Sequence, residues 1–273
     1  PYIYKTDDYG QTWEKLHQGL PSGSVNVIIE HPDNSDVLFV GTENSVFVSV
    51  NSGEKWAKVS GNLPTTLYDD MLIHPRDKDL VLGTHGRSFW ILDDTSPFAE
   101  WHQSKDKNVH LFSIRPATLF YYWKDTSYRG QEEWVGPNPP YGALINFVVN
   151  NEADSARVSI SRNKKIVREY NIAVNKGKLD QLVWNLKYAP PSFEKNEKKT
   201  EGLTKPDRSQ LLPIPAHNLD PKGPDVSPGT YLVTIYAGDD SYSQKVKIYG
   251  DPKLDIKAGN YRQREEFLLK LHV

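Results

Sequence analysis

A repeat of about 43 residues near the start of the chain most constrains what it can fold into. Three landmarks recur 43 positions later: Trp13 as Trp56, Leu20-Pro21 as Leu63-Pro64, and His31-Pro32 as His74-Pro75. Gly41-Thr42 recurs after 42 positions, and the lost residue falls in a turn, where a repeat built of strands tolerates a change of length. One four-stranded propeller blade is about 40–45 residues long. The first hundred residues are therefore predicted to form consecutive blades.

Short alternating segments fill the repeat in the order expected of a blade. The predicted strands are 25–30, 37–41, 46–50 and 56–59 in the first full copy, and 68–73, 80–82 and 88–92 in the next. No apolar i, i+3, i+4 pattern survives the Gly and Pro interruptions, which argues against helices. About two and a half blades are predicted: the end of one over 2–16, a full one to Val59 and another to about Phe98.

A turn motif recurs inside the repeat. Residues 6–13 (TDDYGQTW) and 49–56 (SVNSGEKW) share the pattern Ser/Thr-x-Asp/Asn-x-Gly-x-x-Trp. Such a hairpin turn uses a side chain that accepts backbone N–H bonds, a glycine with positive φ and a buried ring. The residues predicted for these structural roles are Asp8 and Asn51, Gly10 and Gly53, and Trp13 and Trp56.

The motif resembles the Asp-box of the sialidase, sortilin and related β-propeller families. Segment 83–94 (GTHGRSFWILDD) is similar to the last blade of large bacterial proteins described as sortilin-like or as BNR-repeat glycosyl hydrolases, and 138–143 and 251–253 also fit that group. The resemblance covers nearly the whole chain, but only the C-terminal part of such a protein. It implies an extracytoplasmic location, which means periplasmic, outer-surface or secreted. The hydrolase description rests on the Asp-box, which is an element of fold.

The repeat is expected to end near residue 98. Thr95 stands where the second box has Gly53, and without glycine the tight turn is not expected. Segment 93–97 is therefore predicted to be the exit from the propeller. The predicted first domain, residues 1–108, comprises the C-terminal blades of an Asp-box β-propeller.

From Val109 on, the repeat disappears while short strands continue. The candidates are 109–114, 118–123, 143–149, 156–161, 165–172, 178–184, 229–236 and 243–249. Short strands separated by turn signals favour a sandwich. Segments 182–185 (LVWN) and 226–233 (VSPGTYLV) resemble the Ig-like domain of flagellar hook-capping and secretion-sorting proteins. An Ig-like β-sandwich is predicted over 109–252, with long loops at 124–142 and 189–223.

The last residues, 253–273, are predicted to be a linker and the start of a helix. Asn260 is the expected N-cap, and Phe267, Leu268 and Leu271 share one face. The fold class is thus all-β with a short C-terminal helix. Aromatic residues within 128–143 leave two interpretations open: stacking on a sugar, or packing that fixes an interface with the propeller.

Composition excludes several classes of function. The net charge of -2 at pH 7 provides no basic surface for nucleic acid, and no segment approaches the ~18 apolar residues of a membrane span. The absence of cysteine excludes disulfides, a thiol nucleophile and Cys-based zinc sites. Residues 7–10 lack an EF-hand-like ligand series. No metal and no cofactor are predicted.

The candidate ligand-binding residues are His85 and Arg87, with Asp69 and Asp70 second. His85 and Arg87 follow a predicted strand on a loop, and Gly86 lets the backbone turn between them. A histidine can transfer protons near neutral pH and an arginine can hold an anion. The structural alternative is a salt bridge from Arg87 to Asp93 or Asp94.

Catalysis by this chain alone is not expected. The adjacent Asp7 and Asp8 point apart in a turn, whereas glycosidase acids face each other across ~5–9.5 Å. A sialidase also needs an arginine cluster and a Tyr/Glu nucleophile pair, and no such constellation is present. The predicted function is a binding or scaffold module for a peptide or glycan. The alternative is part of a glycoside hydrolase whose catalytic residues lie mainly in N-terminal blades outside this chain.

The expected partners are those further blades, because propellers close with 4–8 of them. We expect Tyr2, Tyr4, Val27 and Ile29 to face a partner surface rather than water. The isolated chain is expected to self-associate, since open blade faces are apolar. The sandwich alone, from about Val109, is expected to be monomeric.

Overall fold

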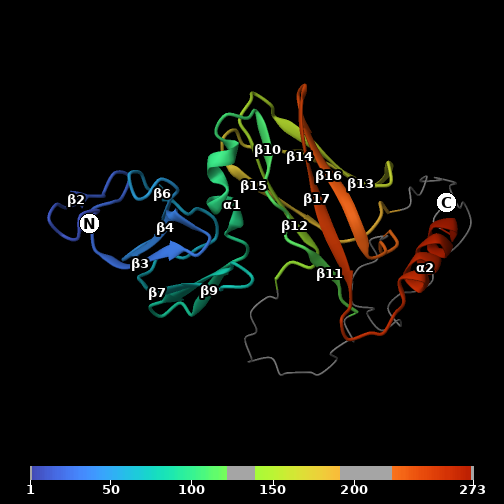
Figure 1. Ribbon diagram of the computed structural model, residues 1–273, viewed down its shortest axis with the longest axis horizontal. Coiled ribbons are helices and arrows are strands. Elements are labelled where there is room, and N and C mark those ends of the chain that lie inside the picture. Colours follow the sequence, from blue (N-terminus) through green and yellow to red (C-terminus); the bar gives the residue numbers. More distant parts are fainter. Residues whose placement is uncertain (1, 122–138, 191–222, 272–273) are drawn as a thin grey trace, which may run out of the picture. The chain divides into compact units, whose positions relative to one another are not determined.

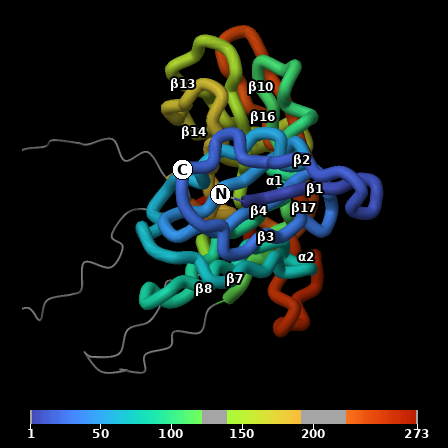
Figure 2. Tube along the Cα trace, turned by 90° about the vertical axis from the view of Figure 1, so that its left-hand side faces the viewer, coloured from blue at the N-terminus to red at the C-terminus, as the bar shows by residue number. Residues whose placement is uncertain are grey.

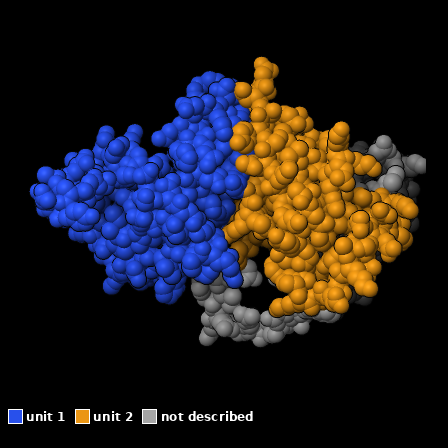
Figure 3. Space-filling view, in the orientation of Figure 1, with its two compact units in different colours: residues 1–113, 146–152, 175–180 blue, residues 114–145, 153–174, 181–273 orange. Residues whose placement is uncertain are grey.

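The computed structural model describes residues 2–121, 139–190 and 223–271, and these are mostly β (Figure 1). They form two compact units (Figure 3): unit 1 comprises 1–113, 146–152 and 175–180, and unit 2 comprises the remainder. The boundary predicted near residue 108 falls inside unit 1. Most of the predicted loops 124–142 and 189–223 lies outside the described residues.

Unit 1 contains three small antiparallel sheets in chain order. They are β1 (Tyr4–Lys5) with β2 (Glu14–Lys15); β3 (Val25–His31), β4 (Asn34–Thr42), β5 (Val46–Ser49) and β6 (Ala57–Lys58); and β7 (Tyr68–Ile73), β8 (Leu80–Thr84) and β9 (Phe89–Leu92). All seven strands predicted within 25–92 are present. Each sheet is a meander, so consecutive strands are neighbours.

The two repeats also share a β-bulge at the equivalent position. The β3–β4 register skips one residue of β3, Asn26, and the β7–β8 register skips one residue of β7, Asp69. These bulge residues lie 43 positions apart. A bulge bends its strand and increases the local twist, so the two sheets are distorted at the same point.

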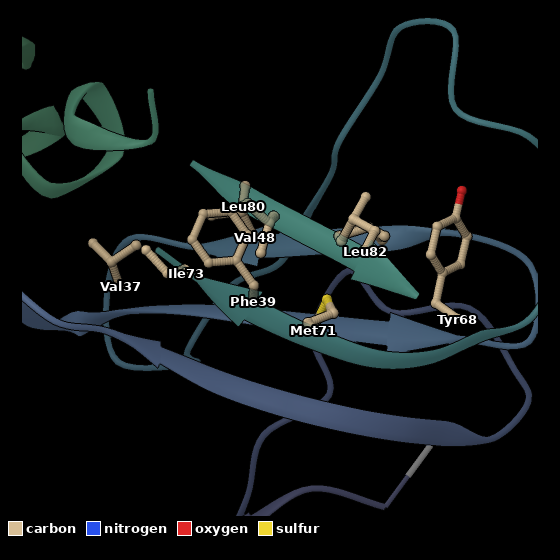
Figure 4. Close-up of a cluster of buried hydrophobic side chains, with 9 residues drawn as sticks. Val37, Phe39, Val48, Tyr68, Met71, Ile73, Leu80 and Leu82 are labelled. Atoms are coloured by element: carbon tan, nitrogen blue, oxygen red, sulfur yellow. The ribbon is translucent and has the colours of Figure 1, made fainter. Parts of the chain in front are cut away.

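One apolar core holds the second sheet against the third (Figure 4). Its buried members come from β4, β5, β7 and β8: Val37, Phe39, Val46, Val48, Tyr68, Met71, Ile73, Leu80 and Leu82. Strand β3 runs beside β7 (Figure 2). Gly41 of β4 lies next to both strands: a Cβ there would lie 2.8 Å from Val27 Cγ1 of β3 and 2.9 Å from Tyr68 Cβ of β7. Only glycine allows so close an approach.

The expectation that Val27 and Ile29 face a partner was wrong. Both side chains pack against the core that joins the second and third sheets. Alternate residues of a strand point to opposite faces, and these two point toward β7, whereas Ile28 between them is exposed. Tyr2 and Tyr4 are exposed, and their contact with a partner remains a prediction.

The two box tryptophans differ in burial. Trp56 is 3% exposed and packs with Ile3 and Leu16 of the preceding sheet. Trp13 is 60% exposed, so its predicted burial was wrong.

After β9 the chain leaves the sheet in a short helix, α1 (Ser96–Ala99), and a 3₁₀ helix, η1 (Trp101–Ser104). The Phe98 ring packs edge-to-face on Phe39 at 5.5 Å between centroids. Asn34 Nδ2 donates to the Ala99 carbonyl oxygen at 2.8 Å. No third Asp-box turn forms, as the loss of glycine predicted.

The remaining strands form two further sheets. The three-stranded sheet has β10 (Val109–Leu111), β12 (Ala143–Val149) and β15 (Leu179–Trp184); the five-stranded sheet, in spatial order, has β11 (Ala117–Leu119), β17 (Asp240–Gly250), β16 (Gly229–Ala237), β13 (Ser155–Arg162) and β14 (Lys165–Ala173). Seven of the eight predicted strands are present, and β11 covers only the start of the eighth, 118–123, whose last two residues lie outside the described residues. Strand β11 is parallel to β17. The Ig-like type of this region remains a prediction.

The C-terminal helix α2 (Ala258–Leu271) begins before Asn260, so the predicted N-cap was wrong. Its buried residues are Tyr261 and Glu265, while Phe267 and Leu271 are exposed. The Glu265 carboxylate accepts hydrogen bonds from the Ser227 hydroxyl at 2.6 Å and the Tyr188 hydroxyl at 2.9 Å. A buried carboxylate together with Tyr261, rather than the predicted apolar face, therefore holds this helix against the rest of unit 2.

Replacing Gly41 tests the close packing of the two sheets. Gly41→Ala is expected to lower the free energy of unfolding by ~1–3 kcal/mol, because the new methyl group overlaps Val27 and Tyr68. The matched control is Gly83→Ala, where the added Cβ meets only Asp70 atoms at 3.5 Å or more. Denaturant unfolding of both variants measures the difference, and equal stabilities would contradict the packing.

Candidate functional site

The first Asp-box is a turn closed by its own side chains. Thr6 Oγ1 accepts a hydrogen bond from Gly10 N at 2.8 Å, and Asp8 Oδ1 accepts one from Thr12 N at 2.8 Å. The Thr12 hydroxyl also donates to Asp8 Oδ2 at 2.7 Å. Gly10 has a φ of 88°, the left-handed conformation that favours glycine.

The second box repeats these bonds with different residue types. Ser49 Oγ accepts from Gly53 N at 2.9 Å, and Asn51 Oδ1 accepts from Lys55 N at 3.1 Å. Gly53 has a φ of 87°. An amide oxygen thus does what a carboxylate oxygen does in the first box, so the motif needs an acceptor and not a charge.

Hydrogen bonds from Thr12, through its backbone N–H and then its hydroxyl, lower the pKa of Asp8 to about 2. A general acid needs a raised pKa, so Asp8 is unsuited to that role. Asp7 pairs instead with Lys5 at 3.2 Å. The two carboxylates form no catalytic pair.

The Asp-box turns and the candidate binding residues lie at opposite ends of the strands in unit 1. The box at 49–56 shares its end with the β3–β4 turn, as Ser52 N donates to the Asp36 carbonyl oxygen at 2.8 Å. Three loops lie at the other end: 42–45 after β4, 59–67 after β6 and 84–88 after β8. We call these three loops the loop end.

At the loop end the structure brings His85 and Asp69 together. His85 Nδ1 lies 3.6 Å from Asp69 Oδ2, and both side chains are exposed. The His85 backbone is fixed on both sides: its N–H donates to the Leu67 carbonyl oxygen and its carbonyl accepts from the Thr66 hydroxyl, each at 2.9 Å. Asp69 is the bulge residue of β7, and the bulge places its carboxylate beside the loop that carries His85.

Arg87 is exposed on the same loop as His85. Its alternative partners, Asp93 and Asp94, follow β9 at the Asp-box end. The four extended residues of β9 separate their backbone from that of Arg87 by ~13 Å. This distance is too great for an ion pair between the side chains. Asp94 is buried and accepts from Asn146 Nδ2 at 3.2 Å.

Asp70 is placed apart from the pair. Its Oδ1 accepts from Met71 N at 2.8 Å. Strand alternation puts Asp70 on the same sheet face as Leu72, which is exposed, and this is the face turned away from the core. The structure therefore groups three of the four candidates at the loop end, with Asp70 on the outer sheet face.

The sequence reasoning missed a groove of about 230 Å³ beside these residues. Segments 44–46, 58–61 and 63–65 line it together with Tyr68, and Thr66, next to this lining, bonds to His85. Its polar side chains are Asn44, Ser45, Lys58, Ser60 and Thr65. These residues belong to no recognisable motif. The only signal in the sequence is the repeat, because in a sheet of antiparallel strands the loops after alternate strands lie at the same end.

Unit 2 has a second cavity of about 230 Å³, lined by Leu119, Phe120, Tyr121, Tyr141, Lys187 and Asp225. Asp225 pairs there with Lys187, and also with Arg264 at 3.2 Å. Among the described residues no cluster of three or more His, Asp or Glu side chains suits a metal. In the same part of the chain no helix is long and apolar enough to span a membrane.

Residues 2–179 match the family model of Sortilin-Vps10 (sortilin, neurotensin receptor 3). The chain belongs to the Sortilin-Vps10 family. No curated protein sequence matches it. The similarity to the sortilin group expected from the Asp-boxes is confirmed for this region, while the hydrolase and Ig-like resemblances remain predictions.

Two solved structures from B. thetaiotaomicron are similar to this Sortilin-Vps10 chain. One is the extracellular domain of a hybrid two-component system, with 8% identity, a TM-score of 0.26 and coverage of 95% of this chain and 28% of that one. The other, described as from a one-component system, has 10% identity, a TM-score of 0.24 and coverage of 93% and 30%. The chain spans less than a third of their length.

The pKa of Asp8 gives a direct test of the box. We expect the Thr12 amide NMR shift to titrate with a midpoint of about 2, because the ionised carboxylate holds that N–H in the fold. The stabilisation is complete above the ordinary aspartate pKa of ~3.9 and is lost as pH falls through the folded value. Asp8→Asn should abolish the titration and keep the turn, since Asn51 fills the same place. A midpoint near 3.9 would show that the bonds do not form.

Proposed function

We propose that this chain is a binding module of an extracytoplasmic protein, and that the loop end of unit 1 holds a peptide or glycan. The observation that carries the proposal is the exposed His85–Asp69 pair, held on a fixed backbone next to a polar groove. Stability alone gives little reason for such a pair, because an exposed ion pair contributes ~0–1 kcal/mol.

The chemistry of the loop end suits a polar ligand. Arg87 and Lys58 supply cationic donors, Asp69 supplies an acceptor, and Ser60 and Thr65 supply hydroxyl groups. Ligand sites typically combine a concave surface with a few convergent polar groups. A peptide with an anionic group, or a glycan with many hydroxyls, can use the same set.

The proposal includes further blades as partners and an Ig-like scaffold over 109–252. Propellers close with 4–8 blades, and unit 1 contains three sheets of the repeat type. The extracytoplasmic location follows from the resemblance of the Asp-boxes to those of the sortilin group.

The alternative is a glycoside hydrolase whose catalytic residues lie mainly in N-terminal blades. It requires two carboxylates about 5–9.5 Å apart across a substrate. At the loop end Asp69 is engaged by His85 and Glu43 lies on a different loop, and the Asp-box carboxylates are at the other end. We expect no turnover of aryl-glycosides or sialosides by this chain. Hydrolysis above that of a boiled sample would favour the hydrolase.

Two substitutions test the loop end. His85→Ala and Arg87→Ala are expected to weaken binding at least tenfold, about 1.4 kcal/mol, to ligands selected on peptide and glycan arrays, with no change in melting temperature. The matched control is Arg76→Ala, which removes an exposed arginine at the Asp-box end. A fall in melting temperature with unchanged binding would contradict the proposal and assign the residues a structural role.

A further inference from the structure

The cavity of unit 2 combines aromatic walls with an ion pair. Its lining comes from the end of β11, from the segment before β12 and from the chain on either side of the 187–225 bridge. Three lining side chains are aromatic and two are charged: Phe120, Tyr121 and Tyr141, and Lys187 and Asp225. Tyr141 belongs to the aromatic segment 128–143, for which sugar stacking and interface packing were both open interpretations. The structure gives this member of the segment a place in a cavity.

A series of polar contacts holds one side of the cavity in place. Asp251 Oδ2 accepts from Tyr121 N at 3.0 Å, and the Arg264 guanidinium donates to the Tyr121 hydroxyl oxygen at 2.7 Å. The same guanidinium donates to Asp225 at 3.2 Å, and Asp225 also pairs with Lys187. The backbones of Lys187 and Asp225 are paired as a β-bridge. These polar groups are fixed before a ligand arrives, which lowers the entropic cost of binding.

The charges of these contacts balance. Two cations, Lys187 and Arg264, stand against two carboxylates, Asp225 and Asp251. Hydrogen bonds from backbone N–H groups, above all that of Tyr121, lower the pKa of Asp251, so its carboxylate is ionised at neutral pH. A site that selects an ion presents an excess of the opposite charge. The balance here favours an uncharged ligand.

The lining matches the two kinds of surface that a sugar ring has. A pyranose presents C–H groups on its faces and hydroxyls around its rim, so it is held by aromatic walls and by donors and acceptors in pairs. An ammonium and a carboxylate each make several hydrogen bonds, and the contacts of Lys187 and Asp225 with each other and with Arg264 use only part of that capacity. Burial raises the pKa of Tyr121, so its hydroxyl keeps its proton and can donate it while accepting from Arg264.

We propose that this cavity binds one uncharged sugar ring of a glycan. The aromatic walls pack on the C–H face of the ring, and the Lys187–Asp225 pair bonds to adjacent hydroxyls. The volume of about 230 Å³ lies below the ~300–1,000 Å³ of pockets for drug-sized ligands, which suits a single ring. The residues of this site belong to unit 2, and the proposal does not depend on the role of the loop end in unit 1.

The probes are the methyl glycosides of glucose, galactose and mannose, titrated into the whole chain. Amide NMR shifts report both the affinity and the place of binding. A single ring has few atoms, so we expect at least one glycoside to bind with a dissociation constant on the order of 10 mM. The amides of Tyr121, Lys187 and Asp225 should shift, while those of the loop that carries His85 should not.

Two further compounds test the chemistry of the ligand. Cyclohexanol has a ring of the same size with a single hydroxyl, and it should bind at least tenfold more weakly because it cannot engage the ion pair with adjacent hydroxyls. Methyl glucuronide adds a carboxylate to the glucose ring. Since the charges around the cavity balance, it should bind no more tightly than methyl glucoside.

Two chain variants separate the ion pair from the aromatic walls. Lys187→Met keeps the length of the side chain and removes its donors, so at least a tenfold loss of affinity is expected. Its matched control is Lys176→Met, which breaks an exposed lysine–glutamate pair in unit 1. Phe120→Ala removes part of the wall and should weaken binding roughly threefold to tenfold. Its matched control is Phe89→Ala, which removes an exposed phenylalanine of unit 1. Both controls should bind as the unsubstituted chain does.

Each result decides the proposal. If Lys187→Met does not fold, Phe120→Ala decides it instead: weaker binding with an unchanged melting temperature supports the site, and unchanged binding overturns it. Cyclohexanol bound as tightly as the glycosides would reveal a merely apolar pocket, and tighter binding of methyl glucuronide would reveal an anion site; either overturns the proposal. Absence of any shift with all three glycosides overturns it as well. Shifts confined to the loop of His85 would place the sugar at the loop end, which overturns this site and supports the proposed function.

Discussion

The packing of the second sheet on the third organises unit 1, and it depends on a missing Cβ. At Gly41 the strand β4 approaches Val27 and Tyr68 so closely that any side chain would overlap them. This contact sets the distance between the sheets and lets Phe39 and Leu82 interdigitate in the same core. Because the sheets are locked in register, equivalent loops of successive repeats come out side by side. The groove and the His85–Asp69 pair are consequences of that alignment.

The Asp-box contributes to folding and is remote from the groove. Its bonds are the same whether the acceptor is Asp8 or Asn51, and the ionised state of Asp8 follows from donors within the turn. A motif that works equally well with an amide carries no information about acid–base chemistry. The presence of the box therefore supports the Sortilin-Vps10 fold and leaves the activity to be argued from the loop end.

The sequence predicted the strands well because their signal is local. Turn residues and alternation set where each strand begins and ends, and the 43-residue period fixed which strands are equivalent. Predictions about burial failed where a distant segment decides. Trp13 matches Trp56 in sequence, yet Trp56 is covered by Ile3 and Leu16 while Trp13 is exposed in the described structure. In helix α2, Glu265 is buried because Ser227 and Tyr188 supply donors, and no helical periodicity shows that.

The candidate site was predicted only in part, because segments distant in sequence complete it. His85 and Arg87 share a loop that is visible in the sequence, but the approach of Asp69 requires the bulge in β7. The polar lining of the groove comes from loops of two repeats, which have no common motif. Only folding at the repeat spacing brings them to one end.

One position explains both the end of the repeat and the lack, among the described residues, of a fourth strand beside β9. Where the second box has Gly53, the third has Thr95, which is fully buried. Its hydroxyl donates to the Lys78 carbonyl oxygen at 2.6 Å and lies 3.1 Å from His31 Nε2. His31 Nδ1 accepts from Asp33 N, so Nε2 carries the proton and donates to Thr95; burial lowers the pKa of His31 and keeps the ring neutral.

The threonine therefore ties the chain to the Asp-box end at the point where a glycine would have turned it back along β9. In the second repeat the turn at Gly53 returns the chain as β6, which covers β5. In the third repeat the chain continues as α1 instead, and Phe98 packs on Phe39 rather than returning to the sheet. Tying the chain to the Asp-box end and leaving β9, within the described part of the chain, without a strand on its outer side are thus two results of the same change in sequence.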